Sequence, residues 1–302
     1  MQTVQWDFGK VPSGTSANIY ILGDLHIGHV GCHKNLVRQH VKRIASDPSA
    51  HVCLVGDILD SIGLTDKRFS LSQLDPEIIG KKRDDIVAQQ IDMAYDLLGP
   101  IANKIRIVLI GNHEWAYCAH SGGVDPLRIL VERLNLSDPP PNCAVNKPYM
   151  AAYSGYLRLR WLNEIGSSKS NDRHWRVDLS LHHGAGGGRK PGAKVNRLDD
   201  RAGWWPTADI VASGHNHART MHERAGIAMA ERCLSEEQRV QICFNTGSYL
   251  RTYFQDCEGS HYGERADYPP SALGGVVAKV TMLRDEHEGK TRRYVTLAGG
   301  FL

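Results

Sequence analysis

Short apolar runs that end at glycine or at polar residues recur along the chain. Their length and their content of β-branched residues predict buried strands rather than helices. Five of these runs are followed directly by polar residues: Ile19 to Leu22, His51 to Val55, Ile105 to Ile110, Val177 to Leu181 and Ala208 to Ala212. Later segments, Val240 to Phe244, Gly275 to Met282 and Arg293 to Leu297, also read as strands.

Helical periodicity appears between the first strands. Apolar residues at helical spacing predict helices over Lys34 to Ala45, Asp85 to Leu98 and Asp125 to Leu134. Residues 143–163 alternate in a way that predicts antiparallel strands, and residues 61–84 read as an insertion or loop. With no interdomain linker in view, we expect one α/β domain over residues 1–302.

Polar residues with metal-binding side chains follow each of the five runs. In order they are Asp24 and His26, then Asp57, then Asn112 and His113, then His182 or His183, then His215 and His217. The carboxyl ends of strands line the ligand crevice of open α/β sheets, so these side chains can meet in space. Oxygen and imidazole ligands without thiolate suit Mn, Fe, Zn, Co or Ni. The sequence therefore predicts a metal site.

Composition narrows the class of protein. The net charge of +3 over 302 residues does not indicate a uniformly basic nucleic-acid-binding surface. The seven cysteines form no CxxC pair, which argues against a disulfide scaffold and a Cys-type zinc site. No signal peptide and no run long enough to span a membrane is visible, so we expect a cytoplasmic protein without a membrane partner.

The strand-end residues form an ordered series of motifs. It runs Asp24-Leu25-His26, Gly56-Asp57-Ile58-Leu59-Asp60, Gly111-Asn112-His113-Glu114, His182 and Gly214-His215-Asn216-His217. This series resembles the calcineurin-like metallophosphoesterases, from about residue 19 to residue 217. The resemblance implies a four-layer α/β/β/α sandwich of two mixed sheets that holds two divalent metal ions, with Mn favoured.

The resemblance also implies a role for each residue. Asp24, His26 and His217 would hold one metal, Asn112, His182 and His215 would hold the other, and Asp57 would bridge them. His113 would act as general acid or stabilise charge on the leaving oxygen. Two cations about 4 Å apart lower the pKa of a bridging water, so that hydroxide can attack phosphorus in line with the leaving group.

Three assignments near these motifs stay open. We place His182 as the ligand in preference to His183 because it directly follows Leu181, and His183 would then face the substrate or the turn. Asp60 and Glu114 are candidate acceptors for histidine N–H groups.

The resemblance implies a phosphate-ester substrate, and the sequence favours a phosphodiester or nucleic acid, DNA or RNA. Arg189 and Lys190, with Lys194, follow a glycine-rich loop and are candidate phosphate contacts. The loop is not a P-loop, and His113 to Tyr117 fails the HExxH pattern. Two alternatives remain: a phosphomonoesterase or cyclic-nucleotide-type phosphodiesterase, and a metal-binding scaffold without catalysis.

Overall fold

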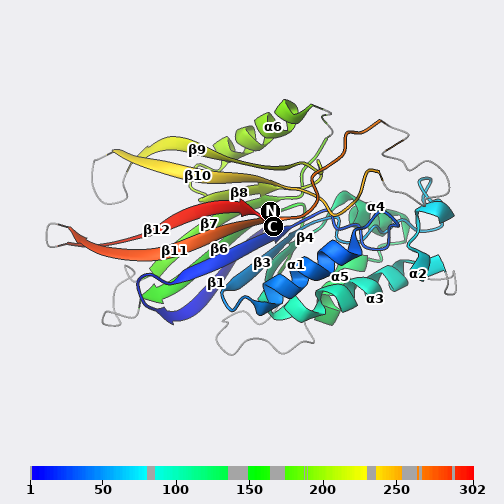
Figure 1. Cartoon of the computed structure of the whole chain (residues 1–302), viewed down its shortest axis with the longest axis horizontal. Coiled ribbons are helices and arrows are strands. Elements are labelled where there is room, and N and C mark those ends of the chain that lie inside the picture. Colours follow the sequence, from blue (N-terminus) through cyan, green and yellow to red (C-terminus); the bar gives the residue numbers. More distant parts are fainter. Residues whose placement is uncertain are drawn as a thin grey trace.

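The computed structural model describes most of the chain. It covers residues 2–79, 86–134, 149–163, 174–186, 188, 190–229, 236–253, 264, 267–287 and 290–302. Twelve strands in these ranges form two six-stranded mixed sheets, which face each other (Figure 1). The first sheet has the order β1-β6-β7-β8-β10-β9, and the second has the order β12-β11-β2-β3-β4-β5.

The strands of the first sheet are β1 (Gln2–Val11), β6 (Ser154–Asn163), β7 (His174–His182), β8 (Ile210–Ser213), β9 (Arg219–Met229) and β10 (Glu236–Thr246). Those of the second are β2 (Ser16–Leu22), β3 (Ala50–Val55), β4 (Ile105–Leu109), β5 (Tyr149–Ala151), β11 (Val276–His287) and β12 (Lys290–Phe301). In the second sheet β2, β3, β4 and β5 are parallel, whereas β11 pairs antiparallel with β2 and β12. The carboxyl ends of β2, β3 and β4 therefore meet at one edge.

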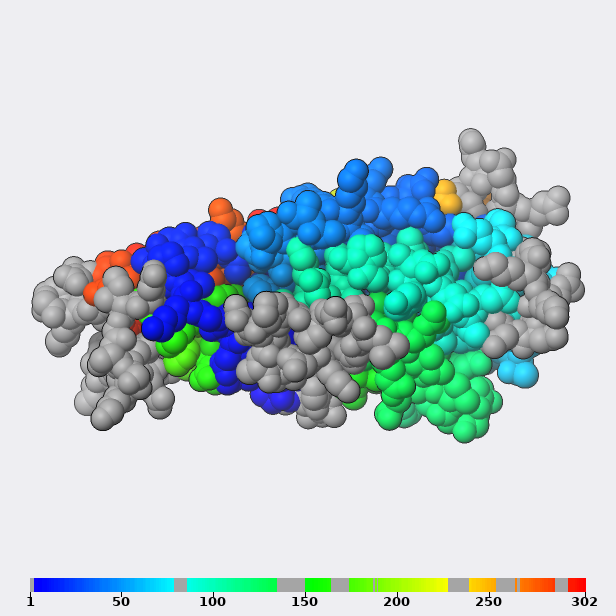
Figure 2. All heavy atoms as spheres, turned by 90° about the horizontal axis from the view of Figure 1, so that it is seen from below, coloured from blue at the N-terminus to red at the C-terminus, as the bar shows by residue number. Residues whose placement is uncertain are grey.

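Helices cover the outer face of each sheet. They are α1 (Lys34–Ser46), the short α2 (Pro76–Ile79), α3 (Ile86–Leu98), α4 (Asn112–His120), α5 (Pro126–Leu134) and α6 (Pro191–Trp204). Two 3₁₀ turns span Leu71–Gln73 and Gly99–Lys104. Figure 2 looks onto the layer over the second sheet, where α1 and α3 lie side by side. Helix α6 packs on the opposite side, against β8, β9 and β10 (Figure 1).

Alternation along each strand produces this layering. In β2, Ile19 and Ile21 face the other sheet, whereas Tyr20 and Leu22 pack with the helices. In β8, Ile210 and Ala212 join the core between the sheets, while Val211 lies under α6. Successive side chains of a strand point to opposite faces, so strands buried on both faces have continuous apolar sequences. The expected four-layer α/β/β/α fold is confirmed.

Most expected elements are present, but some elements and one strand pairing differ from the expectation. Helices α1, α3 and α5 form where the periodicity places them, although residue 85 lies outside the described residues. Helices α4 and α6 are not among the elements that the periodicity predicts, because the motif at Asn112 and the glycines before Pro191 favour loops. Pro191 instead occupies the first turn of α6, where its missing N–H costs nothing.

The antiparallel pairing expected within residues 143–163 is wrong in part. Strand β5 pairs parallel with β4 in one sheet, while β6 pairs with β1 and β7 in the other, antiparallel only to β7. The chain thus crosses between sheets at residues 152–153, which polar alternation alone does not reveal. Within the residues that the structure describes, no helix is long and apolar enough to cross a membrane.

Candidate metal centre

The site lies at the carboxyl ends of β2, β3, β4, β7 and β8, where the backbone turns sharply. Seven non-glycine residues in the described part have positive φ, and five of these belong to the motifs. They are Asp24 (53°), His26 (47°), Asp57 (50°), His215 (69°) and His217 (51°). Left-handed backbone costs energy for any residue with a Cβ, and such strain concentrates at functional sites. These turns aim the side chains back across the sheet edge.

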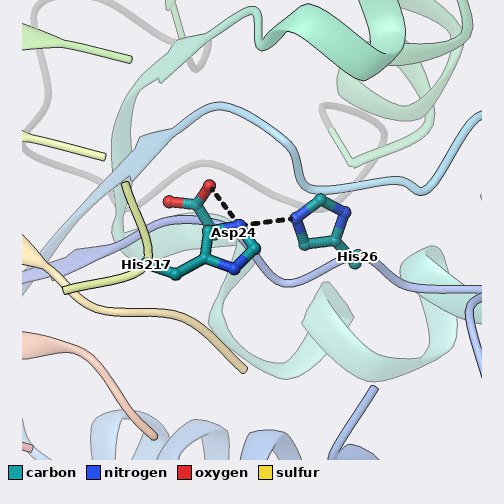
Figure 3. Close-up of side chains that lie close together, drawn as sticks. All are labelled: Asp24, His26 and His217. Atoms are coloured by element: carbon teal, nitrogen blue, oxygen red, sulfur yellow. Dashed lines mark hydrogen bonds and ion pairs between the residues drawn. The ribbon is translucent and has the colours of Figure 1, made fainter. Parts of the chain in front are cut away.

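The first group of side chains is Asp24, His26 and His217 (Figure 3). The Nε2 atom of His217 lies 3.4 Å from Asp24 Oδ1 and 3.3 Å from His26 Nε2. Asp24 and His26 are buried, and the Asp24 carboxylate accepts the His215 backbone N–H at 2.9 Å. This bond joins the loops after β2 and β8, so residues nearly two hundred positions apart share one small space.

The second group is Asp57, His183 and His215, with the Asn112 amide beside it. Asn112 Oδ1 lies 2.7 Å from His215 Nδ1 and 3.0 Å from His183 Nε2. His183 Nε2 is also 3.4 Å from Asp57 Oδ2. The same Asp57 oxygen lies 3.9 Å from His26 Nε2, so it faces both groups.

The structure places His183 among the candidate metal ligands, where the sequence analysis placed His182. His183 is fully buried at the centre, whereas His182 is half-buried and its Nδ1 accepts the backbone N–H of Gly184. The reason is that β7 continues through His182, which pairs with Ser154 and Ser213. His183 therefore continues the face of Leu179 and Leu181, which points toward the other sheet. The alternation of β7 places His183 on this face only because strand pairing carries the strand through His182.

The atoms that surround His183 Nε2 are electron-rich, so a positive charge is needed between them. A carbonyl only accepts, so His183 Nδ1 donates to Val55 O at 2.9 Å and the neutral ring has a lone pair on Nε2. That lone pair faces the oxygens of Asn112 and Asp57. Either a proton or a metal cation relieves this contact. Burial lowers the pKa of His183, but Asp57 outweighs it and raises the pKa to about 10. The donor set fits a metal.

Glu114 supports the loop that carries Asp57. It is buried in the first turn of α4, and its carboxylate accepts backbone N–H groups of Asp57, Ile58, Leu59 and Gly111 at 2.7 to 3.2 Å. The expectation that Glu114 accepts a histidine N–H is wrong. Burial and the nearby Asp57 charge raise the pKa of Glu114 to about 7, while the Leu59 N–H opposes that rise.

Asp60 and His113 form the border of the site. His113 Nδ1 lies 2.7 Å from the Asp60 carbonyl oxygen, to which it donates. The Asp60 carboxylate lies 3.5 Å from the same nitrogen and 3.6 Å from His26 Nδ1, but its Oδ1 accepts no hydrogen bond from the described residues, so its expected role as an acceptor of histidine N–H groups stays a prediction. Burial lowers the pKa of His113, but Asp57 and Asp60 outweigh it and raise the pKa.

A pocket of about 810 Å³ opens over the two groups. His26, Asp57, Asn112, His113, His215 and His217 form its floor. One wall comes from the segment expected to be a plain loop, and it contains Lys67, Arg68, Phe69, Ser70, Ser72 and Gln73. Nothing in the periodicity of this segment marks these residues as part of the site.

The basic residues after the glycine-rich loop lie elsewhere. Lys190 is exposed and does not line the pocket, and Arg189 lies outside the described residues. Lys194 is in α6, and its Nζ donates to the carbonyl of Asn216 at 2.8 Å. It steadies the loop of His215 and His217.

Comparison with known proteins identifies the family. Residues 17–219 match the sequence profile of the calcineurin-like phosphoesterases. The fold and the site define a metal-dependent phosphoesterase. The chain belongs to the calcineurin-like phosphoesterase family, whose members are hydrolases that use divalent metals.

Two solved structures that match this chain are distant in sequence. One is a conserved uncharacterised protein, described as a predicted phosphoesterase, from Streptococcus pneumoniae TIGR4, with 12% identity and a TM-score of 0.29. The match covers 93% of this chain and 99% of that one. Another is GAP50, the anchor in the inner membrane complex of Plasmodium, with 9% identity, a TM-score of 0.43 and coverage of 92% and 88%. No curated protein matches this chain. Neither structure bears on substrate or partner.

Proposed function

We propose that this protein hydrolyses phosphodiesters, including nucleic acid, with two divalent metal ions. The observation that carries the proposal is the position of Asp57. One of its carboxylate oxygens faces His26 of the first group at 3.9 Å and His183 of the second at 3.4 Å. A carboxylate shared in this way suits two cations held side by side, for which Mn is the first candidate.

The ligand sets follow from the two groups. Asp24, His26 and His217 would hold one metal, and Asn112, His183 and His215 would hold the other. When bound, the cations would activate a water molecule and offset negative charge on the phosphoryl oxygens. The imidazoles and the Asn112 amide are neutral ligands, so the loaded centre keeps a positive charge that attracts an anionic ester. Asp57 is tied to α4 by the backbone N–H of His113, which donates to its Oδ1 at 3.0 Å.

His113 is the candidate general acid. It lines the pocket floor, and its Nδ1 is committed as a donor to Asp60 O, so Nε2 is the nitrogen that gains and loses the exchangeable proton. The carboxylates of Asp57 and Asp60 raise its pKa, which favours the protonated ring. During hydrolysis the bond from phosphorus to the leaving oxygen breaks, and Nε2 would give its proton to that oxygen.

The pocket supports an ester larger than a simple phosphate. A volume of about 810 Å³ accommodates substituents on both sides of a phosphoryl group. Phe69 adds apolar surface, and Lys67 and Arg68 add positive charge. The volume and the apolar surface favour a phosphodiester over a phosphomonoester, and the positive charge suits either anion.

Turnover of bis(p-nitrophenyl) phosphate and of single-stranded DNA in the presence of Mn²⁺ tests the proposal. We expect the metal-stripped protein to be inactive and to recover with Mn²⁺. His113→Ala should lower kcat by about 10²–10⁴-fold while Mn²⁺ binding stays intact. A protein that binds Mn²⁺ and hydrolyses no phosphate ester with any divalent metal would instead be the scaffold without catalysis.

A further inference from the structure

The pocket wall made by residues 66–73 is a preformed surface. Its backbone is held by turns in which Phe69 N donates to Asp66 O and Leu74 N donates to Leu71 O. It is also tied to the loop after β2, because Val30 N donates to Gln73 O at 2.9 Å and Asp75 N donates to Gly28 O at 2.9 Å. The wall therefore stands at a fixed position beside His26.

Phe69 anchors this wall and shapes its inner surface. Its ring packs partly against the small apolar cluster of Leu74, Ile78 and Ile86 while it also lines the pocket. An aromatic ring fixed in this way offers a flat apolar surface to whatever enters the pocket.

Arg68 is held in place by its neighbour Asp66. Its Nε and Nη2 donate to the Asp66 carboxylate at 3.1 and 2.7 Å, a two-point contact that fixes the guanidinium plane. A guanidinium has five N–H donors. Among the described residues, no acceptor besides the Asp66 carboxylate binds the N–H groups of Arg68. Arg68 lines the pocket, so a fixed cation with free donors faces the space above the metal groups.

Arg68 is also within electrostatic reach of the reacting centre. Its pairing with Asp66 raises its pKa most, and the charges of Asp60 and Asp57 add to that rise. In turn, the charge of Arg68 opposes the rise in the pKa of His113. Arg68 and His113 line the same pocket, and His113 is the group proposed to protonate the leaving oxygen, so the guanidinium faces the space that the leaving group would enter.

We propose that Arg68, positioned by Asp66, binds a second phosphate on the leaving group of the substrate, and that Phe69 contacts the nucleoside between the two phosphates. The proposal rests on the phosphodiesterase function above and extends it. The preferred substrate is then an oligonucleotide or another ester with a neighbouring phosphate, rather than an isolated diester. Charge-assisted contacts of this kind contribute about tenfold to a hundredfold in kcat/KM.

The test compares thymidine dinucleotides that carry a terminal phosphate, at either end, with the dinucleotide that lacks one. We expect the Mn²⁺-loaded wild type to cleave one phosphorylated form about tenfold or more faster in kcat/KM. Arg68→Met should abolish that preference, so that kcat/KM falls about tenfold more for the phosphorylated dinucleotide than for the form without the terminal phosphate, while Mn²⁺ affinity stays within about twofold. Arg128→Met is the matched control, because Arg128 is 68% exposed on α5 and pairs only loosely with Asp125, at 3.9 Å.

Two results would overturn the inference. A preference that survives in Arg68→Met would show that another group reads the second phosphate. An equal loss on every substrate, with weaker Mn²⁺ binding, would mean that Arg68 only supports the fold.

Measurements of ligand binding distinguish a failure of this inference from a failure of the proposed function. If the wild type cleaves no diester, the proposed function fails, and calorimetry on the Mn²⁺-loaded protein still tests the subsite. Arg68→Met should then weaken binding of thymidine 3′,5′-bisphosphate about tenfold and leave thymidine monophosphate unchanged. Equal affinity of both variants for the bisphosphate would refute the subsite.

Discussion

Replacing His182 or His183 with alanine shows which of the two adjacent histidines contributes to metal binding. His183 is fully buried, its Nδ1 is fixed by Val55 O at 2.9 Å, and its Nε2 faces Asn112 and Asp57. Loss of a residue that merely orients a ligand costs about 10–100-fold in metal affinity, so loss of the ligand itself should cost at least about 100-fold. His183→Ala should therefore lose one of the two metals that we propose.

His182→Ala is the matched control on the neighbouring position. His182 accepts one hydrogen bond, from the Gly184 N–H at 2.7 Å, and lies outside both groups of ligand atoms. Its loss should lower the free energy of unfolding by about 1 kcal/mol and change metal affinity by less than about threefold.

Metal content by mass spectrometry and Mn²⁺ titration by calorimetry measure these effects, with circular dichroism to confirm folding. If His182→Ala loses a metal and His183→Ala retains both, the assignment from the alternation of β7 is refuted.

Three further predictions concern the buried charges. Glu114→Gln should weaken Mn²⁺ binding by about 10–100-fold without removing a ligand, because the loop of Asp57 loses its carboxylate acceptor; unchanged calorimetric affinity would contradict this. Mn²⁺ affinity should rise as pH increases from 6 to 9, because the metal competes with a proton on His183, whose pKa is raised to about 10 in the metal-free protein; a pH-independent affinity would contradict it. Burial, and then Arg43 and Arg219, lower the pKa of His40 to about 4, so the unfolded state takes up a proton first as pH falls from 6.5 to 4. That proton uptake should destabilise the wild type by at most about 3 kcal/mol relative to His40→Gln, measured by urea unfolding at both pH values, and parallel pH profiles would contradict it.

The sequence determined the five strands that lead to the motifs and the residues at the ends of those strands. Ile19 to Leu22 and Ile105 to Ile110 are short and continuously apolar, and burial on both faces of a sheet produces that pattern whatever the rest of the chain does. Glycines and polar residues then end each strand locally. Asp24, Asp57 and Asn112 could be recognised for this reason, since they depend on where a strand stops.

Other features depended on contacts between distant segments. Whether His182 or His183 enters the site depends on how far β7 extends, and its pairing with β6 and β8 carries the strand one residue beyond the apolar run. The role of residues 66–73 depends on hydrogen bonds to residues 28–30. Such bonds leave no local periodicity.

The sequence by itself thus determined the fold class and the kinds of side chain at the strand ends, because alternation and strand ends are local properties of the chain. Only the tertiary structure decided which histidine faces Asp57 and which cation faces the pocket. Those choices depend on the register of neighbouring strands and on the path of a loop, both of which are fixed by contacts between residues far apart in sequence.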